Sequence, residues 1–403
     1  MNKRHRFTAQ ILEKISERIL FISSTVTSLA VLLIIIFMFR EGLGLFNHTP
    51  VEEGSILAIN RANPVKELTA EQVKKIFDQE ITNWKEVGGI DSTIELFRID
   101  DIFNFYTEEQ VGSEFENLGQ LLSEHINAHS NILAFFPAHF KIKNFLGKEL
   151  PVEKISFGKF FLGKEWFPTA HPAAQFGILS LILGTLWISI GAILIALPFG
   201  LATAIYMSEI ADERVRNFLK PVIELLAGIP SVVYGFFGLV VIVPAIQQIF
   251  NLPVGETALA GSIILGVMAL PTIITISEDA LRTTPRTLKE ASLALGANQW
   301  QTIYKVTVPY ASSGITAAAI LGIARAMGET MAVLMVTGNA AVIPTSFLQP
   351  VRTIPATIAA ELGEAPQDGM HYKALFALGC ILFFITLIIN FAVQYISSRK
   401  KHG

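Results

Sequence analysis

Two charged residues stand inside an apolar stretch in the last quarter of the chain. Arg325 and Glu329 lie within residues 312–337, where Ala318, Gly322 and Ala326 recur every four residues and predict a ridge for close helix packing. A charge at the centre of a bilayer costs about 2.5–3.5 kcal/mol on insertion scales, so such side chains must face protein or water. Their four-residue spacing places both on one face of a helix, where they can pair. Two interpretations stay open: a structural ion pair, or an Arg325 that attracts an anion along a pathway while Glu329 sets its geometry.

A polar segment, residues 283–311, separates two long apolar runs and is predicted to contain a short helix. Its pattern consists of Glu290, Ala291, Ser292, Gly296, Val306, Val308 and Pro309. The pattern resembles the "EAA" loop of ABC-importer permeases, a cytoplasmic helix-turn-helix that sits in a groove of the ATPase subunit. Ser292, Val306 and Val308 depart from that family's Ala, Ile and Leu but keep size or apolarity. The resemblance implies that these residues couple the chain to a separate ATPase.

A second stretch has the spacing of a nucleotide site but lacks its chemistry. Residues 158–165, GKFFLGKE, match seven places of a phosphate loop, but the eighth is Glu165, where Ser or Thr must hold Mg²⁺. We therefore expect an interfacial segment here and no cofactor in this chain, with ATP and Mg²⁺ bound by the partner ATPase. We find no catalytic triad, redox motif or nucleic-acid signature, and so predict a transport subunit, not an enzyme, with no nucleic-acid partner.

The composition is that of a membrane protein. Of the 403 residues, 51% are hydrophobic, and a single cysteine, Cys380, excludes an internal disulfide and is expected to lie buried in a membrane helix. A bilayer-crossing helix needs about 20 apolar residues. Runs of that length occur at 19–39, 176–207, 219–249, 257–281, 312–337 and 372–396. We predict an all-α polytopic membrane protein of the ABC-importer permease type, with six transmembrane helices and a small α/β extracytoplasmic domain between the first two.

Basic residues alternate between the loops in a way that predicts orientation. Lys and Arg gather in both tails and in the 209–220 and 282–305 loops, whereas the 250–256 loop has none and the 338–371 loop has only Arg352. Cytoplasmic loops carry this excess. We therefore place both termini in the cytoplasm and residues 41–172 outside. The expected division is 1–40 as tail and first helix, 41–156 as insert, and 157–403 as permease domain.

Several apolar segments extend the resemblance beyond the loop. Residues 176–209, 216–244 and 322–339 look like the PstC-type permeases of phosphate ABC importers, and the match runs through roughly 157–400. This resemblance implies a bacterial inner-membrane protein in the lipid bilayer. Its partners would be a second, PstA-like permease, an ATPase dimer and a periplasmic phosphate-binding protein. Arg325 and Glu329 fall in the family's Arg-Ala-x-Gly-Glu-Thr segment, and residues 225–235 would line the translocation path.

The segment between the first two apolar runs is too long for a loop and has a soluble composition. Residues 55–60 and 92–99 are predicted strands, and 68–77 a helix with a Thr69–Gln72 capping box. Residues 63–89 resemble part of a periplasmic phosphate-binding protein, but after Arg98 the expected Ser-Gly-Thr turn is replaced by an acidic stretch. Docking of the binding protein, a structural relic, or ligand binding therefore all stay open for this domain.

Three histidines of this segment, His125, His129 and His139, have no acidic or cysteine partner at ligand spacing. A solvated helix face is the simpler interpretation, and no metal site is predicted.

The sequence thus predicts the permease subunit of an ATP-driven importer for inorganic phosphate. A permease for another oxyanion, such as phosphonate, sulfate or molybdate, is the first alternative. An ion-gradient-driven secondary carrier would show internal inverted repeats, which we do not find. A membrane receptor would need a cytoplasmic signalling domain, whereas the inner tails are short.

Overall fold

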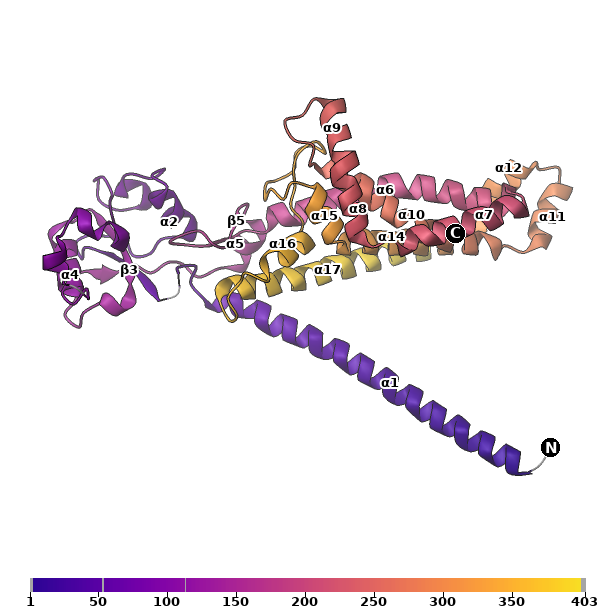
Figure 1. Ribbon diagram of the computed structural model, residues 1–403, viewed down its shortest axis with the longest axis horizontal. Coiled ribbons are helices and arrows are strands. Elements are labelled where there is room, and N and C mark those ends of the chain that lie inside the picture. Colours follow the sequence, from indigo (N-terminus) through magenta and orange to yellow (C-terminus); the bar gives the residue numbers. More distant parts are fainter. Residues whose placement is uncertain (1–2, 53, 113, 400–403) are drawn as a thin grey trace.

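The computed structural model describes residues 3–52, 54–112 and 114–399 (Figure 1). Of the basic residues used above to predict orientation, Lys400 and Lys401 lie outside the described residues, and Lys3, Arg4, Arg6 and Arg399 are described by their helical backbone alone. The described chain forms an elongated molecule, with a small α/β domain at one end of a helix bundle and a short helical projection at the other (Figure 1).

The bundle contains most of the helical residues. Its helices are α1 (Lys3–Gly44), α6 (Leu179–Ile205), α7 (Glu213–Gly228), α8 (Ser231–Phe237), α9 (Val243–Phe250), α10 (Ala258–Arg282), α14 (Ser312–Gly328), α15 (Met331–Val336), α16 (Ile354–Glu361) and α17 (Met370–Arg399). Among the described residues, five helices are long and apolar enough to cross a membrane, and a sixth span results if one bent pair of helices counts as one. The chain is therefore a multi-pass membrane protein, and the predicted fold class is confirmed.

Two of the predicted apolar runs are each divided between two helices. The 219–249 run divides between α7 and α8 at Ile229 and Pro230, because proline has no amide hydrogen to continue the ladder. The 312–337 run divides between α14 and α15, and Glu329 there is extended, with φ −73° and ψ 130°. The helical segment Gln299–Tyr310 also meets Ser312–Gly328 at an angle of 69°.

Small residues let the central helices approach closely. Ala318, Gly322 and Ala326 are all buried along α14, and a Cβ at Gly322 would lie 2.9 Å from Ile273 Cδ1 of α10. The expected ridge of small residues is thus confirmed. On α6, a Cβ at Gly184 would lie 2.2 Å from the carbonyl oxygen of Arg352, so only glycine fits this contact.

Helix α1 contacts α17 at its C-terminal end and diverges from the bundle towards its N-terminal end (Figure 1). The contact lies at its C-terminal end, where Phe37 meets Phe376 edge to face at 5.5 Å and the Cys380 thiol donates to the carbonyl of Met38. Cys380 is buried, as predicted. From residue 14 to 34 the side chains of α1 are exposed in this single chain.

The α/β domain is built on a four-stranded sheet with helices on both faces. Its strands are β1 (Ser55–Ile59), β2 (Glu95–Arg98), β3 (Ile132–Pro137) and β4 (Lys148–Glu149), in the order β2-β3-β1-β4. Strand β3 is parallel to β2 and antiparallel to β1, which is antiparallel to β4. Helix α2 (Ala70–Phe77) packs with the sheet residues Leu57 and Ile59, whereas α4 (Leu118–Ala128) packs with Ala58 and Phe97 on the other face.

The α/β domain contains the local elements that its sequence predicts. Both predicted strands form, and Thr69 and Gln72 make the predicted capping box at the start of α2. The face formed by Val73, Ile76 and Phe77 is buried.

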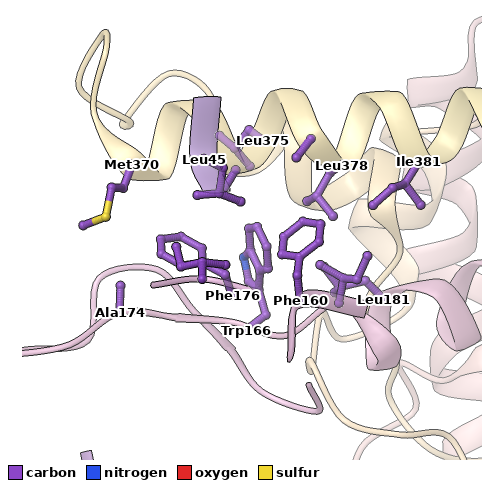
Figure 2. Packing of buried hydrophobic residues seen from close by; sticks show 14 of the residues in the cluster. Leu45, Phe160, Trp166, Ala174, Phe176, Leu181, Met370, Leu375, Leu378 and Ile381 are labelled. Carbon is purple, nitrogen blue, oxygen red and sulfur yellow. The ribbon is translucent and has the colours of Figure 1, made fainter. Parts of the chain in front are cut away.

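The base of this domain packs directly on the bundle. Helix α5 (Phe157–Leu162) and strands β5 (Trp166–Phe167) and β6 (Gln175–Phe176) lead into α6. Figure 2 shows Phe160, Trp166 and Phe176 beneath α17, where they pack in one cluster with its Leu375 and Leu378. The base is therefore joined to the bundle by a buried apolar contact as well as by the chain.

Candidate functional site

The predicted coupling segment is a helix-turn-helix at the end of the bundle opposite the α/β domain (Figure 1). It comprises α11 (Arg286–Ala294), α12 (Gln299–Thr302), the π-helical turn Ile303–Thr307 and α13 (Val308–Tyr310). Gly296 makes the turn with φ +87°, a conformation that favours glycine. Asn298 then starts α12 through a capping box with Gln301.

The residues of the predicted pattern divide between the free face and the root of this element. Glu290 and Ala291 are exposed on α11, and Pro309 is exposed on α13. Val306 and Val308 are half-buried, and Val308 packs against the cluster that joins α6, α10 and α14. Glu290 and Ala291 thus lie on the exposed surface of the projection, whereas Val308 attaches the projection to the bundle.

Ser292, which replaces the family's alanine, has a structural partner. Its Oγ lies 2.9 Å from Thr302 Oγ1, so the two hydroxyls join α11 to α12. The replacement therefore adds a hydrogen bond across the turn as well as preserving a small side chain.

The free face of the projection is strongly apolar. No side chain of α11, all of which the structure describes, is buried. Leu295 is 89% exposed and Trp300 64% exposed, with Leu288, Leu293 and Tyr304 also exposed nearby. An exposed apolar surface on a short projecting helix is typical of a protein–protein contact.

Polar contacts hold the projection to the bundle. Lys289 Nζ lies 2.7 Å from Glu209 Oε1, and Gln299 Nε2 donates to the Glu209 carbonyl at 3.0 Å. Glu209 lies in the π-helical segment Tyr206–Ile210 that extends α6, so these contacts join the projection to that helix.

A buried carboxylate near the same end of the bundle was missed by sequence reasoning. Glu278 of α10 is 1% exposed, and its oxygens lie 3.1 Å from Arg216 Nε, 3.8 Å from Lys220 Nζ and 3.7 Å from Arg282 Nη1. The available signal was an acidic pair interrupting the last turn of an apolar span. Its partners on α7 could not be identified without the fold.

Arg325 and Glu329 do not pair in the described part of the chain. Arg325 is half-buried and its Nη1 donates to Thr272 Oγ1 of α10 at 3.3 Å. Glu329 lies beyond the end of α14 and accepts a hydrogen bond from the Ala332 amide of α15 at 3.4 Å. The expectation of one continuous helical face was wrong, because the helix ends at Gly328 before a full turn separates the two.

A further polar centre lies near the α/β domain. Glu361 of α16 is bonded at 2.8 Å to Arg352 Nη2 and at 2.8 Å to His371 Nε2 of α17, and at 3.0 Å to Trp166 Nε1. Burial alone would raise the pKa of Glu361, but the hydrogen bonds from His371 and Trp166 and the charge of Arg352 together lower it. This centre ties the base of the domain to two bundle helices.

Arg98 of the α/β domain is used structurally. Its Nη2 donates to the carbonyl of Phe77 at 3.1 Å, and its guanidinium lies 5.1 Å from the centre of the Phe77 ring. Residues Ile99–Asn104, which follow it, form a 3₁₀ helix in place of the Ser-Gly-Thr turn that the resemblance led us to expect.

Comparison with known proteins identifies the class. Residues 196–402 match the family of binding-protein-dependent transport system inner membrane components, and the chain belongs to that family. Residues 40–112 separately match the PBP superfamily domain.

Individual relatives agree with the predicted resemblance to PstC-type permeases. The chain is 41% identical over 273 residues to the probable ABC transporter permease protein YqgH of Bacillus subtilis, covering 67% of this chain and 88% of the relative. It is 39% identical over 264 residues to the phosphate transport system permease protein PstC of Mesorhizobium japonicum, covering 60% and 80%. A solved structure of the MetNI methionine ABC transporter is 22% identical, with a TM-score of 0.42, and covers 56% of this chain and 94% of that chain.

Proposed function

We propose that this chain is the permease subunit of an ATP-driven importer that carries inorganic phosphate across the bacterial inner membrane. The projecting helix-turn-helix carries the proposal, because its exposed apolar face has the features of a docking element for a separate motor subunit. The relatives named for phosphate transport support the substrate.

In this proposal the ATPase subunits, with their ATP and Mg²⁺, grip α11 from the cytoplasmic side. Closure of an ATPase dimer moves α11, and the Lys289–Glu209 ion pair transmits that movement to the α6 extension. The attached helices then tilt between inward-facing and outward-facing arrangements. Both chain termini lie in the cytoplasm and residues 41–172 lie in the periplasm.

Arg325 is the residue that we assign to the anion pathway. A guanidinium inside a membrane bundle must face protein or water, and here it has a neutral hydroxyl as its partner. Its charge is therefore not neutralised by Glu329, which is engaged at the start of α15. A PstA-like permease would complete the pathway, and a periplasmic phosphate-binding protein would deliver the anion.

The test is phosphate uptake by cells or vesicles that contain the assembled complex. We expect Arg325→Ala to reduce uptake severely and Arg325→Lys to restore part of it, since Lys keeps the charge and loses the planar fork. Arg214→Ala is the control, because Arg214 is exposed at the bundle end. Normal uptake by Arg325→Ala in assembled complexes would contradict the assigned role, and equal competition by sulfate or molybdate would contradict phosphate specificity.

Coupling is tested separately. Gly296→Val forces a β-branched residue into φ +87°, so we expect a distorted turn, ATP hydrolysis without uptake and an unchanged amount of inserted protein. Gly363→Val is the matched control, because a Cβ there meets no atom within 4 Å and its φ is outside the left-handed region. Purification of the complex would identify the ATPase and the second permease; purification of an active chain without an ATPase would refute the proposal.

A further inference from the structure

Two histidines and a glutamate converge in the α/β domain, although they lie far apart in the sequence. One carboxylate oxygen of Glu95 and one ring nitrogen each of His125 and His129 lie within 4.8 Å of one another. In the sequence, these two histidines have no acidic residue at ligand spacing. The fold supplies that partner from strand β2, which lies beneath the C-terminal end of α4.

The strand period explains why Glu95 faces α4. Residues two apart on a strand point to the same face. Phe97 is fully buried in the α4 cluster, and its ring centre lies 5.3 Å from that of His125. Glu95, two residues earlier, therefore points to the same helix. His125 and His129 follow each other by one turn at the end of α4, with ring centres 4.4 Å apart.

Each imidazole has a partner at Nδ1, which leaves Nε2 as the nitrogen that can bind an ion. His129 Nδ1 lies 3.0 Å from the carbonyl oxygen of His125, which can only accept, so Nδ1 carries the proton and Nε2 keeps its lone pair. His125 Nδ1 lies 3.1 Å from the hydroxyl of Tyr106, which can accept its proton. The buried His125 Nε2 has no hydrogen-bond partner among the described residues.

This arrangement has the features of a metal site before the ion binds. Metal-bound histidines almost always donate their other ring proton to a carbonyl, carboxylate or water, which fixes the ring. Nitrogen ligands disfavour Mg²⁺ and Ca²⁺, whereas two imidazoles and one carboxylate suit Zn²⁺ and neighbouring transition metals. Three protein ligands leave at least one coordination position for water.

We propose that Glu95, His125 and His129 form a binding site for a divalent transition-metal ion, with Zn²⁺ as the reference ion. The ligand atoms must approach slightly, since bonds of about 2.0–2.2 Å are needed. The ion would clamp the end of α4 to β2 at the point where the chain turns into β3, whose first residue, Ile132, is paired with Glu95. This inference is independent of the transported substrate.

The test uses the full-length protein purified in detergent through a tag without histidine, after removal of metals with EDTA. Titration calorimetry with ZnCl₂ is expected to show a site at one ion per chain. His129→Gln and Glu95→Gln should each weaken that site by more than tenfold. Tyr106→Phe, which retains all three ligands, should weaken it by about 10–100-fold, the range measured for partners that orient a ligand.

His139→Gln is the matched control, because His139 is an exposed histidine of the same domain outside the cluster. It should bind Zn²⁺ as the unmodified protein does. Thermal melts in EDTA show whether each variant folds. If a histidine variant does not fold, the Zn²⁺ affinity of Glu95→Gln is the deciding measurement. Lack of a one-to-one site in the unmodified protein, or undiminished binding by folded Glu95→Gln, would overturn the proposal.

Discussion

The buried carboxylate of Glu278 allows a quantitative test of how the coupling end of the bundle is held together. Its side chain is 1% exposed, whereas those of Arg216, Lys220 and Arg282 are 23%, 34% and 43% exposed. Among the described residues, Arg216 makes the one hydrogen bond to it, at 3.1 Å, and the other two cations act through charge at 3.8 and 3.7 Å. We therefore expect the Arg216–Glu278 hydrogen bond to contribute more to stability than the contacts of Lys220 and Arg282.

Two single variants should differ in a defined order. Arg216→Met keeps the apolar stem but leaves a buried carboxylate with cations beyond hydrogen-bond distance. We expect it to lose about 1.5–3 kcal/mol, the value of a charged hydrogen bond, and less than the roughly 3–5 kcal/mol of a fully stranded buried charge. Glu278→Gln should lose about 1–2 kcal/mol, because the amide can still accept from Arg216 and the remaining cations are partly hydrated.

The double variant separates this contact from its surroundings. Once Glu278 is Gln, no buried charge is stranded by Arg216→Met, so the combined loss should be smaller than the sum by about 0.5–3 kcal/mol. The assay is unfolding in mixed detergent–SDS micelles, which gives free energies for all variants. Asp279→Asn is the control, since Asp279 is the exposed neighbour on the same helix. Additive losses, or an Asp279→Asn loss equal to that of Glu278→Gln, would refute the reasoning.

Three further outcomes are expected from other contacts. The pKa of Glu361 is lowered from its ordinary 4.5, so the ionised carboxylate stabilises the fold at neutral pH. Glu361→Gln should therefore destabilise the protein most at pH 7, and the difference from the unmodified protein should shrink as the pH falls below about 4.5, as measured by thermal unfolding. Ser292→Ala removes the bond to Thr302 and should lower stability by about 0.5–1.5 kcal/mol, measured in the same micelle titration, while ATPase binding in pull-down assays persists. Gly184→Ala places a methyl group against the Arg352 carbonyl and should cost about 1–3 kcal/mol in that titration, whereas Gly363→Ala should cost little.

Local patterns in the sequence predicted the elements well. The capping box of Thr69 depends on residues three apart, and the small-residue ridge of α14 depends on residues four apart. Such signals survive in any fold that contains the helix. The same holds for the apolar runs: those at 19–39, 176–207, 257–281 and 372–396 each correspond to one long apolar helical segment of the described chain.

Partners distant in the chain could not be predicted in the same way. Glu278 meets Arg216 and Glu361 meets Trp166 across helices whose relative placement no local pattern specifies. The ion pair that the spacing of Arg325 and Glu329 allowed does not form among the described residues, for a different reason. Four-residue spacing implies proximity only if the helix continues, and here Glu329 adopts an extended conformation just past its end.

The two helix breaks constrain where the polar interior of the assembly can lie. At the first break the Tyr234 hydroxyl donates to the carbonyl of Leu226 at 2.8 Å, and at the second the Glu329 carboxylate accepts from the Ala332 amide. Side chains thus satisfy backbone groups that the helical ladder no longer pairs, as a membrane interior requires. The breaks belong to adjacent helices, since a Cβ at Gly235 of α8 would lie 2.9 Å from the Cα of Ala332.

This geometry distinguishes two kinds of exposed surface. Helix α1 is unbroken, and its exposed residues 19–34 carry no charge, so lipid alone can cover that length. Lipid cannot satisfy a carboxylate or a guanidinium, and Glu329 and Arg325 flank the end of α14 next to the paired breaks. We therefore expect the side of the bundle that contains α8, α15 and the end of α14 to face protein or water in the proposed transporter, and we propose that the solute pathway runs on this side.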